Sequence, residues 1–134
     1  MSTVINQKKK ADLSKLVYKL MREHPDKKMY EIINLAASHP APRFYVSYEN
    51  ARRYVSELER GKELNLKVKH TIDMYKELHR RYVLLRKERR EAGVRRINYT
   101  LLEEIIDSPA PSFYASSDGL RWLFYRHKKK NNTL

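Results

Sequence analysis

The sequence has no cysteine and little glycine or proline, with 3 Gly and 5 Pro among 134 residues. Without cysteine there is no disulfide scaffold, no thiolate metal site and no nucleophilic thiol, which suits a reducing compartment. Three glycines are too few for a phosphate-cradling loop. No apolar run approaches the roughly 18 residues of a membrane span, and the N-terminal residues lack the hydrophobic segment of a signal peptide. We therefore expect an intracellular protein that does not enter a membrane.

Acidic residues are scarce relative to basic ones. The chain has 29 Lys and Arg against 16 Asp and Glu, a formal net charge of +13. Hydrophobic residues make up 41% of the sequence, which indicates a folded protein rather than a disordered polycation. Binding a polyanion is the commonest physical use of such an excess, so the composition favours nucleic acid as the partner.

The positive charge is unevenly distributed. Residues 62–97 hold 12 basic and 5 acidic side chains, a net +7, whereas residues 1–61 hold +5 and residues 98–134 only +1. Two lysine clusters, at residues 8–10 and 128–130, lie near the ends of the chain. They predict a basic N-terminal arm over residues 1–10 and a basic C-terminal tail over residues 128–134.

The most specific motif is a string, Pro-Ala-Pro-x-Phe-Tyr-x-Ser, that occurs twice. It occupies residues 40–47 and 109–116, at an offset of 69 residues, and the flanking sequence aligns without gaps from Tyr30–Val55 onto Tyr99–Phe124. A shared string of this length indicates an internal duplication. The string resembles one in small, basic proteins of Bacteroides-infecting phages and related mobile elements. That resemblance implies the cytoplasm of a bacterial host, or the virion, as the setting, and it assigns no residue a role.

The apolar spacing predicts an all-α fold. Helical periodicity marks a helix near residues 13–21, short helices before each copy of the string, and a long basic helix over about residues 65–92. Ser47 and Ser116 are expected to cap the helices that follow the string, and Thr100 with Glu103 resembles a capping box. We therefore expect a tandem duplication of a three-helix unit within one compact domain. The first unit spans residues 11–61, and the central helix with the second unit spans residues 62–127.

The repeated string also predicts the role of its aromatic residues. Prolines separated by one residue keep the backbone extended, so Phe44 and Phe113 are expected to anchor the chain in the core. Tyr45 and Tyr114 can bury their rings while presenting their hydroxyl groups to solvent. Whether these loops also bind a partner stays open at this point.

A helix that ends at a connection and is followed by a serine-capped helix resembles the outline of a helix-turn-helix protein. There the second helix lies in the major groove, where Arg can bind guanine and Asn can bind adenine. The candidate groove-contacting residues are Asn50, Arg52 and Arg53 in the first copy and Arg121 and Arg126 in the second. The connection over residues 39–46 exceeds the usual turn of three or four residues, so the unit is only helix-turn-helix-like.

The long central helix supplies candidate phosphate-binding residues. Acids are sparse at its C-terminal end, where each Lys or Arg that neutralises a phosphate would release counterions. The candidates are Arg80, Arg81, Arg86, Lys87, Arg89, Arg90, Arg95 and Arg96. Alternatively, the helix could form a homo-oligomer along Tyr75, Leu78, Tyr82 and Leu85.

No motif in the sequence points to catalysis. The five histidines show no i,i+4 pair, and no serine or aspartate lies in a nucleophile motif. We therefore expect no bound metal, no cofactor, no small-molecule substrate and no enzymatic activity. The favoured hypothesis is a non-enzymatic protein that binds double-stranded DNA. Two alternatives stay open. One is a structural or assembly protein of a phage virion, or another protein-interaction module. The other is RNA binding, with Tyr45, Tyr114 and Trp122 stacking on unpaired bases.

Overall fold

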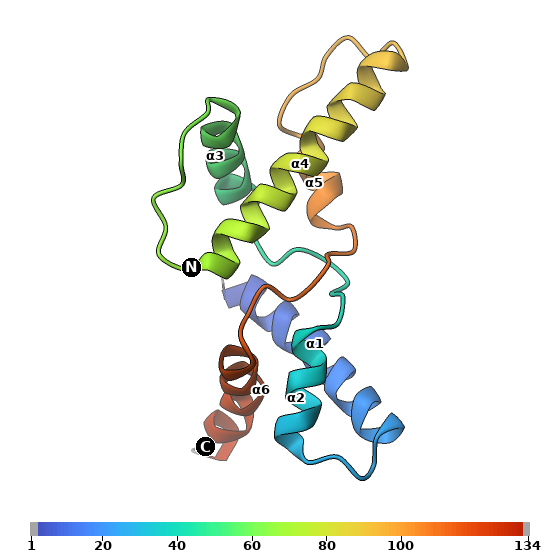
Figure 1. Cartoon of the computed structure of the whole chain (residues 1–134), viewed down its shortest axis with the longest axis vertical. Coiled ribbons are helices and arrows are strands. Elements are labelled where there is room, and N and C mark those ends of the chain that lie inside the picture. Colours follow the sequence, from blue (N-terminus) through green and yellow to red (C-terminus); the bar gives the residue numbers. More distant parts are fainter. Residues whose placement is uncertain (1–2, 133–134) are drawn as a thin grey trace. The chain divides into compact units, whose positions relative to one another are not determined.

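The structure, a computed structural model, describes the backbone of residues 3–132 and the side chains of residues 4–126. Over this range the chain forms six α-helices and no strand, which confirms the all-α class. The helices are α1 (Thr3–Glu23), α2 (Met29–Ala37), α3 (Tyr48–Glu59), α4 (Lys69–Glu91), α5 (Leu101–Ile106) and α6 (Ser117–Asn132) (Figure 1). None of these helices is both long enough and apolar enough to cross a membrane.

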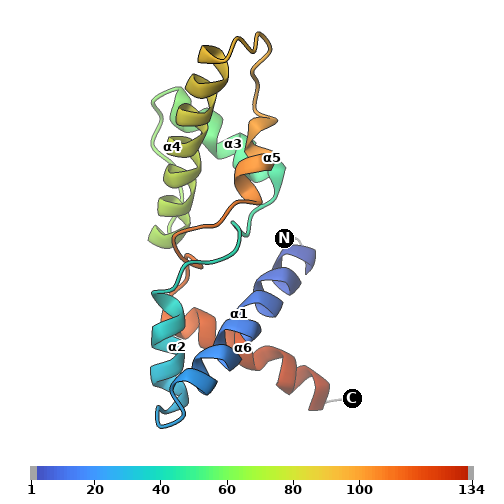
Figure 2. The ribbon, with the colours of Figure 1, turned by 90° about the vertical axis from the view of Figure 1, so that its right-hand side faces the viewer.

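The helices pack as two compact units that do not follow the order of the chain. Unit 1 comprises residues 1–41 and 110–134, and unit 2 comprises residues 42–109. In unit 1, α6 packs against α1 and α2, whereas in unit 2, α3 packs against α4 and α5 (Figures 1 and 2). The helix that follows each copy of the repeated string therefore packs with helices of the other half of the sequence. This grouping differs from the expected consecutive units over residues 11–61 and 62–127.

The extended backbone of the repeated string explains this grouping. In unit 1 the Ala41 N–H donates to the Ala110 carbonyl at 2.9 Å, and the Ala110 N–H donates to the Ala41 carbonyl at 2.8 Å. The flanking prolines keep both alanines extended, so their amide groups pair with each other instead of closing a tight turn. In unit 2 the Phe44 N–H donates to the Ile106 carbonyl at 2.9 Å, which attaches the segment before α3 to the end of α5.

The helix ends follow local sequence signals. The hydroxyl of Ser47 accepts a hydrogen bond from the Asn50 N–H at 3.1 Å, and that of Ser116 accepts one from the Gly119 N–H at 3.0 Å, which confirms both predicted caps. The predicted capping box at Thr100 is wrong. Thr100 has helical backbone angles and makes no side-chain cap, and the Asn98 side chain accepts from the Thr100 N–H at 2.9 Å instead.

Each unit has its own apolar core. Phe44 and Phe113, the equivalent residues of the two strings, are each 2% exposed, with Phe113 in unit 1 and Phe44 in unit 2. In unit 2 the ring centroids of Tyr54 and Tyr75 lie 4.5 Å apart and those of Tyr82 and Tyr99 lie 5.2 Å apart. Burial raises the pKa of Tyr75 to about 12. Tyr75, Leu78 and Tyr82, three of the four residues of the stripe considered for a homo-oligomer, are buried in this core.

The lysine clusters near the ends of the chain do not flank the helices as expected. Residues 8–10 lie inside α1, which begins at Thr3, because no proline or glycine interrupts this segment and lysine is a good helix former. Residues 3–10 of the predicted N-terminal arm are therefore helical. The cluster at residues 128–130 falls in the last turns of α6, and its side chains lie outside the described residues.

The grouping of helices predicts which helices become less stable when a buried side chain of α3 or α6 is shortened. Leu120 in α6 and Val55 in α3 are both 0% exposed. Leu120→Ala should cost about 2–5 kcal/mol and should accelerate amide hydrogen exchange in α1 and α2. Val55→Ala should instead accelerate exchange in α4 and α5. Peptide-level hydrogen-exchange mass spectrometry distinguishes the two patterns, and the reverse assignment would contradict the observed grouping.

Candidate nucleic-acid interface

The N-terminal half of α3 presents polar and basic residues opposite its buried side. Ala51 and Val55 face the core of unit 2, whereas Asn50, Arg52 and Arg53 are exposed. The guanidinium carbon of Arg53 lies 5.1 Å from the Tyr54 ring centroid, and no ion pair of Arg52 or Arg53 is seen within the described residues. We call Asn50, Arg52 and Arg53 the α3 face. It borders a shallow pocket of about 390 Å³, lined by Tyr48, Glu49, Arg52, Arg53 and Ser56.

The candidate phosphate-binding cations of α4 fall into three groups, and the first is occupied inside unit 2. Arg81 donates from Nε to Glu77 at 2.7 Å, and from Nη1 to the Pro109 carbonyl at 2.7 Å and the Ser108 hydroxyl at 3.2 Å. Its guanidinium carbon also lies 4.9 Å from the centroid of the Phe44 ring. Arg81 therefore holds α4 against the segment that follows α5 and has little capacity left for a phosphate.

Arg86 belongs to the same group. It donates to one carboxylate oxygen of Glu59, the last residue of α3, while the other oxygen lies 2.7 Å from Nε2 of His79. The hydrogen bond from His79 and that from Arg86 lower the pKa of Glu59, and the bond to Glu59 raises the pKa of Arg86. The guanidinium carbon also lies 5.1 Å from the Tyr82 ring centroid. This cluster joins the C-terminal end of α3 to α4.

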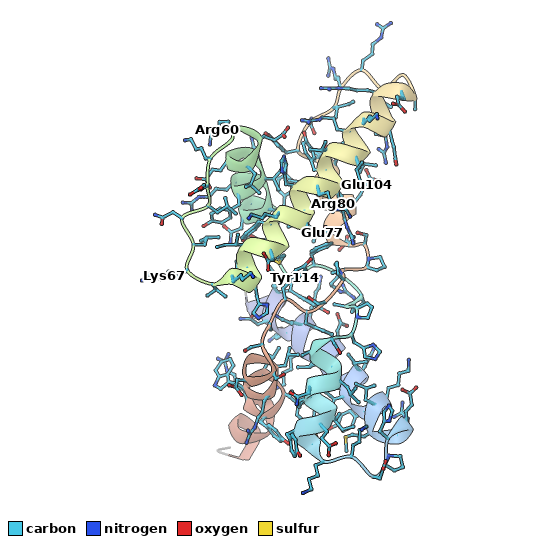
Figure 3. The ribbon with its side chains drawn as sticks, in the orientation of Figure 1. Arg60, Lys67, Glu77, Arg80, Glu104 and Tyr114 are labelled. Carbon is cyan, nitrogen blue, oxygen red and sulfur yellow. The ribbon has the colours of Figure 1, made fainter. Side chains whose placement is uncertain are left out.

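The second group consists of exposed arginines in ion pairs. Arg80 binds Glu77 through two hydrogen bonds of 2.8 and 2.7 Å, and Figure 3 shows the two residues together on α4. Arg89 donates to Glu104 of α5 at 2.8 Å. Exposed pairs of this kind contribute at most about 1 kcal/mol, but a phosphate would have to displace the carboxylate, so these two arginines are weaker candidates than cations without an ion pair.

The third group has exposed cations for which no ion pair is seen within the described residues: Lys87, Arg90, Arg95 and Arg96. They lie in the last turns of α4 and in the loop that follows, which form one end of unit 2 (Figure 2). Gly93, with φ of 85°, ends α4 in a conformation that favours glycine. We call these four residues the α4-end cluster.

The remaining candidates lie in unit 1 and in the loops. Arg121 and Arg126 are exposed on α6, and the guanidinium carbon of Arg126 lies 4.8 Å from the Trp122 ring centroid. Tyr45 and Tyr114 are half-buried. The N–H of Tyr114, which has a φ of 51°, donates to the Ser112 hydroxyl at 3.0 Å.

The grouping of helices changes where the charge lies. Residues 1–41 and 110–134 hold 13 basic and 5 acidic side chains, a net +8, whereas residues 42–109 hold 16 against 11, a net +5. Unit 1 is therefore the more basic unit, although a count over consecutive segments of the sequence places most of the net positive charge in residues 62–97. The described residues contain no cluster of three or more His, Asp or Glu side chains suited to a metal ion.

Sequence reasoning missed two features of the surface. Arg81 is a structural residue because of partners that are distant in sequence, and no local signal identifies it. Tyr30 and Tyr125 are exposed and line a pocket with Arg121. A helical wheel of α6 could have found Tyr125, because it lies one turn after Arg121 and off the buried stripe.

A scan against protein-family models and searches of curated proteins and of solved structures find no match for this chain.

The contacts of Arg81 predict a difference from its neighbour Arg80. Arg81→Ala should reduce the free energy of unfolding by about 1–3 kcal/mol, because it removes the hydrogen bonds to Pro109 and Ser108 and the contact with Phe44. Arg80→Ala is the matched control and should change it by less than about 1 kcal/mol. Urea denaturation measures both, and equal effects would contradict a structural role for Arg81.

Glu77 predicts an acid-dependent loss of stability. Hydrogen bonds from Arg80 and Arg81 hold the pKa of Glu77 at about 2, below its ordinary value of 4.5. A lowered pKa stabilises the folded state above pH 4.5, and this contribution is lost as the pH falls towards 2. Glu77→Gln should therefore destabilise the protein near neutral pH, and the difference from wild type should shrink between pH 4.5 and 2. Urea denaturation at several pH values tests this, with Glu91→Gln as an exposed control.

Proposed function

We propose that this chain is a non-enzymatic protein that binds double-stranded DNA, with the α3 face at the major groove and the α4-end cluster on the phosphate backbone. The observation that carries the proposal is that the candidate residues of unit 2 include six exposed cations for which no ion pair is seen within the described residues: Arg52, Arg53, Lys87, Arg90, Arg95 and Arg96. A folded domain that leaves so many cations uncompensated is suited to a polyanion.

The position of α3 supports contact with the groove. It is a serine-capped helix that packs against the long α4 and the short α5. Helix-turn-helix proteins place the N-terminal residues of such a helix on base edges, where Arg and Asn have suitable hydrogen-bonding groups. Its N-terminus also carries the positive end of the helix dipole, which favours an anion.

The repeated string supports a finer proposal about the fold. We infer that the two units descend from a tandem duplication of one helix-turn-helix-like unit, in which the third helices have exchanged. The equivalent caps at Ser47 and Ser116 and the pairing of the equivalent residues Ala41 and Ala110 support this inference. From the resemblance of the string to phage and mobile-element proteins, we propose a bacterial host or a virion as the setting.

The proposal predicts a salt-dependent affinity for duplex DNA. The logarithm of the binding constant should fall linearly with that of the salt concentration, by about 0.9 for each phosphate neutralised. Replacing the four residues of the α4-end cluster by Gln should reduce this slope by up to about 4 and weaken binding to all sequences alike. Fluorescence anisotropy with a labelled duplex measures both.

Two comparisons make this experiment decisive. Arg80→Gln combined with Arg89→Gln is the control, because both arginines already have carboxylate partners, and the slope should change less. Arg52→Ala combined with Arg53→Ala should reduce the preference among sequences while largely retaining the slope. No binding to duplex DNA, or an affinity independent of salt, would overturn the proposal.

A further inference from the structure

Helix α6 of unit 1 exposes aromatic rings where α3 of unit 2 exposes polar groups. Trp122 and Tyr125 of α6 are 62% and 36% exposed, and Tyr30 of α2 is 59% exposed. At the offset of 69 residues, Trp122 corresponds to Arg53 and Tyr125 to Ser56, whereas Arg121 corresponds to an identical residue, Arg52. Helices α3 and α6 therefore share one exposed arginine and differ in the residues that surround it.

Arg121 and Tyr125 of α6 border a pocket that α2 completes. The pocket has a volume of about 290 Å³ and is lined by Met29, Tyr30, Ile33, Arg121 and Tyr125. Ile33 is buried and contributes an apolar wall, while Tyr30 and Arg121 are exposed. The site thus combines an apolar surface, two tyrosine rings and a guanidinium group.

The two aromatic rings of α6 are held in different ways. Tyr125 packs edge-to-face on the buried Phe124 at a centroid distance of 5.2 Å, and Phe124 packs in turn on Tyr18 of α1 at 5.9 Å. Trp122 has the Arg126 guanidinium carbon 4.8 Å from its ring centroid, and most of its surface remains open to solvent. A cation over an indole ring leaves the opposite face of the ring for another planar group.

We propose that this aromatic face of unit 1, formed by Tyr30, Arg121, Trp122, Tyr125 and Arg126, binds unpaired bases of single-stranded nucleic acid. In a duplex the faces of the bases are stacked on each other and only their edges are accessible, so exposed rings gain little from it. Unpaired bases offer their faces to aromatic side chains and to guanidinium planes. The site does not depend on duplex binding by the α3 face.

Charge favours a nucleic acid over a protein as the occupant. Unit 1 carries a net +8, and both Arg121 and Arg126 lie on the aromatic face. A strand with one phosphate per nucleotide matches alternating rings and cations, because each base can stack while its phosphate meets an arginine. A docking surface for a protein would gain from the rings but would need a strongly acidic partner to compensate this charge.

Trp122 is the only tryptophan, so its fluorescence reports on this face alone. The full-length protein is titrated with a thymidine oligonucleotide, a uridine oligonucleotide, a duplex of equal length and an oligonucleotide of abasic sites. The two single strands should quench the fluorescence, and the relative strength of quenching shows whether DNA or RNA is preferred. The duplex and the abasic strand should leave it nearly unchanged, because neither offers a free base face. Equal quenching by the abasic strand would overturn the proposal.

Variants separate this site from the proposed duplex-binding site. Trp122→Leu and Tyr125→Ser should each weaken binding of a labelled thymidine oligonucleotide by about tenfold or more in fluorescence anisotropy, given the usual contribution of one stacked base. Both should leave the affinity for duplex DNA within about twofold. Arg52→Ala, at the equivalent position of Arg121, is the matched control and should affect the duplex only. Because Trp122 is exposed, its variant should retain the circular dichroism spectrum of the wild type.

Each outcome of the variant series bears on one proposal. If single strands quench Trp122 and the duplex does not bind, the aromatic face is supported and the function proposed for unit 2 fails. If the duplex binds and Trp122→Leu binds single strands as tightly as wild type, the aromatic face is not the site and the proposal is overturned. Binding of an acidic peptide to this face without binding of single strands would also overturn it.

Discussion

The extended backbone at Ala41 and Ala110 decides which helices share a core. Each alanine lies between two prolines, and its N–H and carbonyl groups pair with those of the other alanine at 2.8 and 2.9 Å. A tight turn at these positions would direct the chain back onto the helix it has just left. An extended segment cannot do so, and the following helix packs elsewhere. The composition of both units, and with it the set of residues that reach each surface, depends on this local constraint.

Packing then determines which cations remain available. Arg81, Arg86, Lys87 and Arg90 are all basic residues of α4. Arg81 binds a carbonyl group and Arg86 a carboxylate group within unit 2. A guanidinium group with several hydrogen bonds would lose them on moving to a phosphate, at about 1 kcal/mol for each hydrogen bond. Charge counted along the chain therefore overstates the charge that can meet a ligand. The exposed and uncompensated residues are the relevant ones.

Local features of this fold could be predicted from the sequence, and distant ones could not. The all-α class and the caps at Ser47 and Ser116 follow from periodicity and from hydrogen bonds within three residues. The extended backbone at Ala41 and Ala110 also follows locally from the flanking prolines, but the pairing of these two alanines, 69 residues apart, is encoded by no local pattern. For the same reason the candidate site was only partly predicted. The exposure of Arg52 and Arg53 follows from the helical period, whereas the role of Arg81 depends on Pro109.

Helices α3 and α6 have similar apolar inner positions but different surface residues, and this difference has a thermodynamic consequence. Their inner positions are apolar in both cases, Ala51 with Val55 in α3 and Leu120 with Phe124 in α6. Binding of arginines to phosphates weakens as salt rises, because the release of counterions into a more concentrated salt solution is less favourable. Stacking on Trp122 involves no such release. Binding at the proposed aromatic face, where stacking adds to the contacts of Arg121 and Arg126, should therefore fall less steeply with salt than phosphate binding by the four cations of the proposed α4-end cluster.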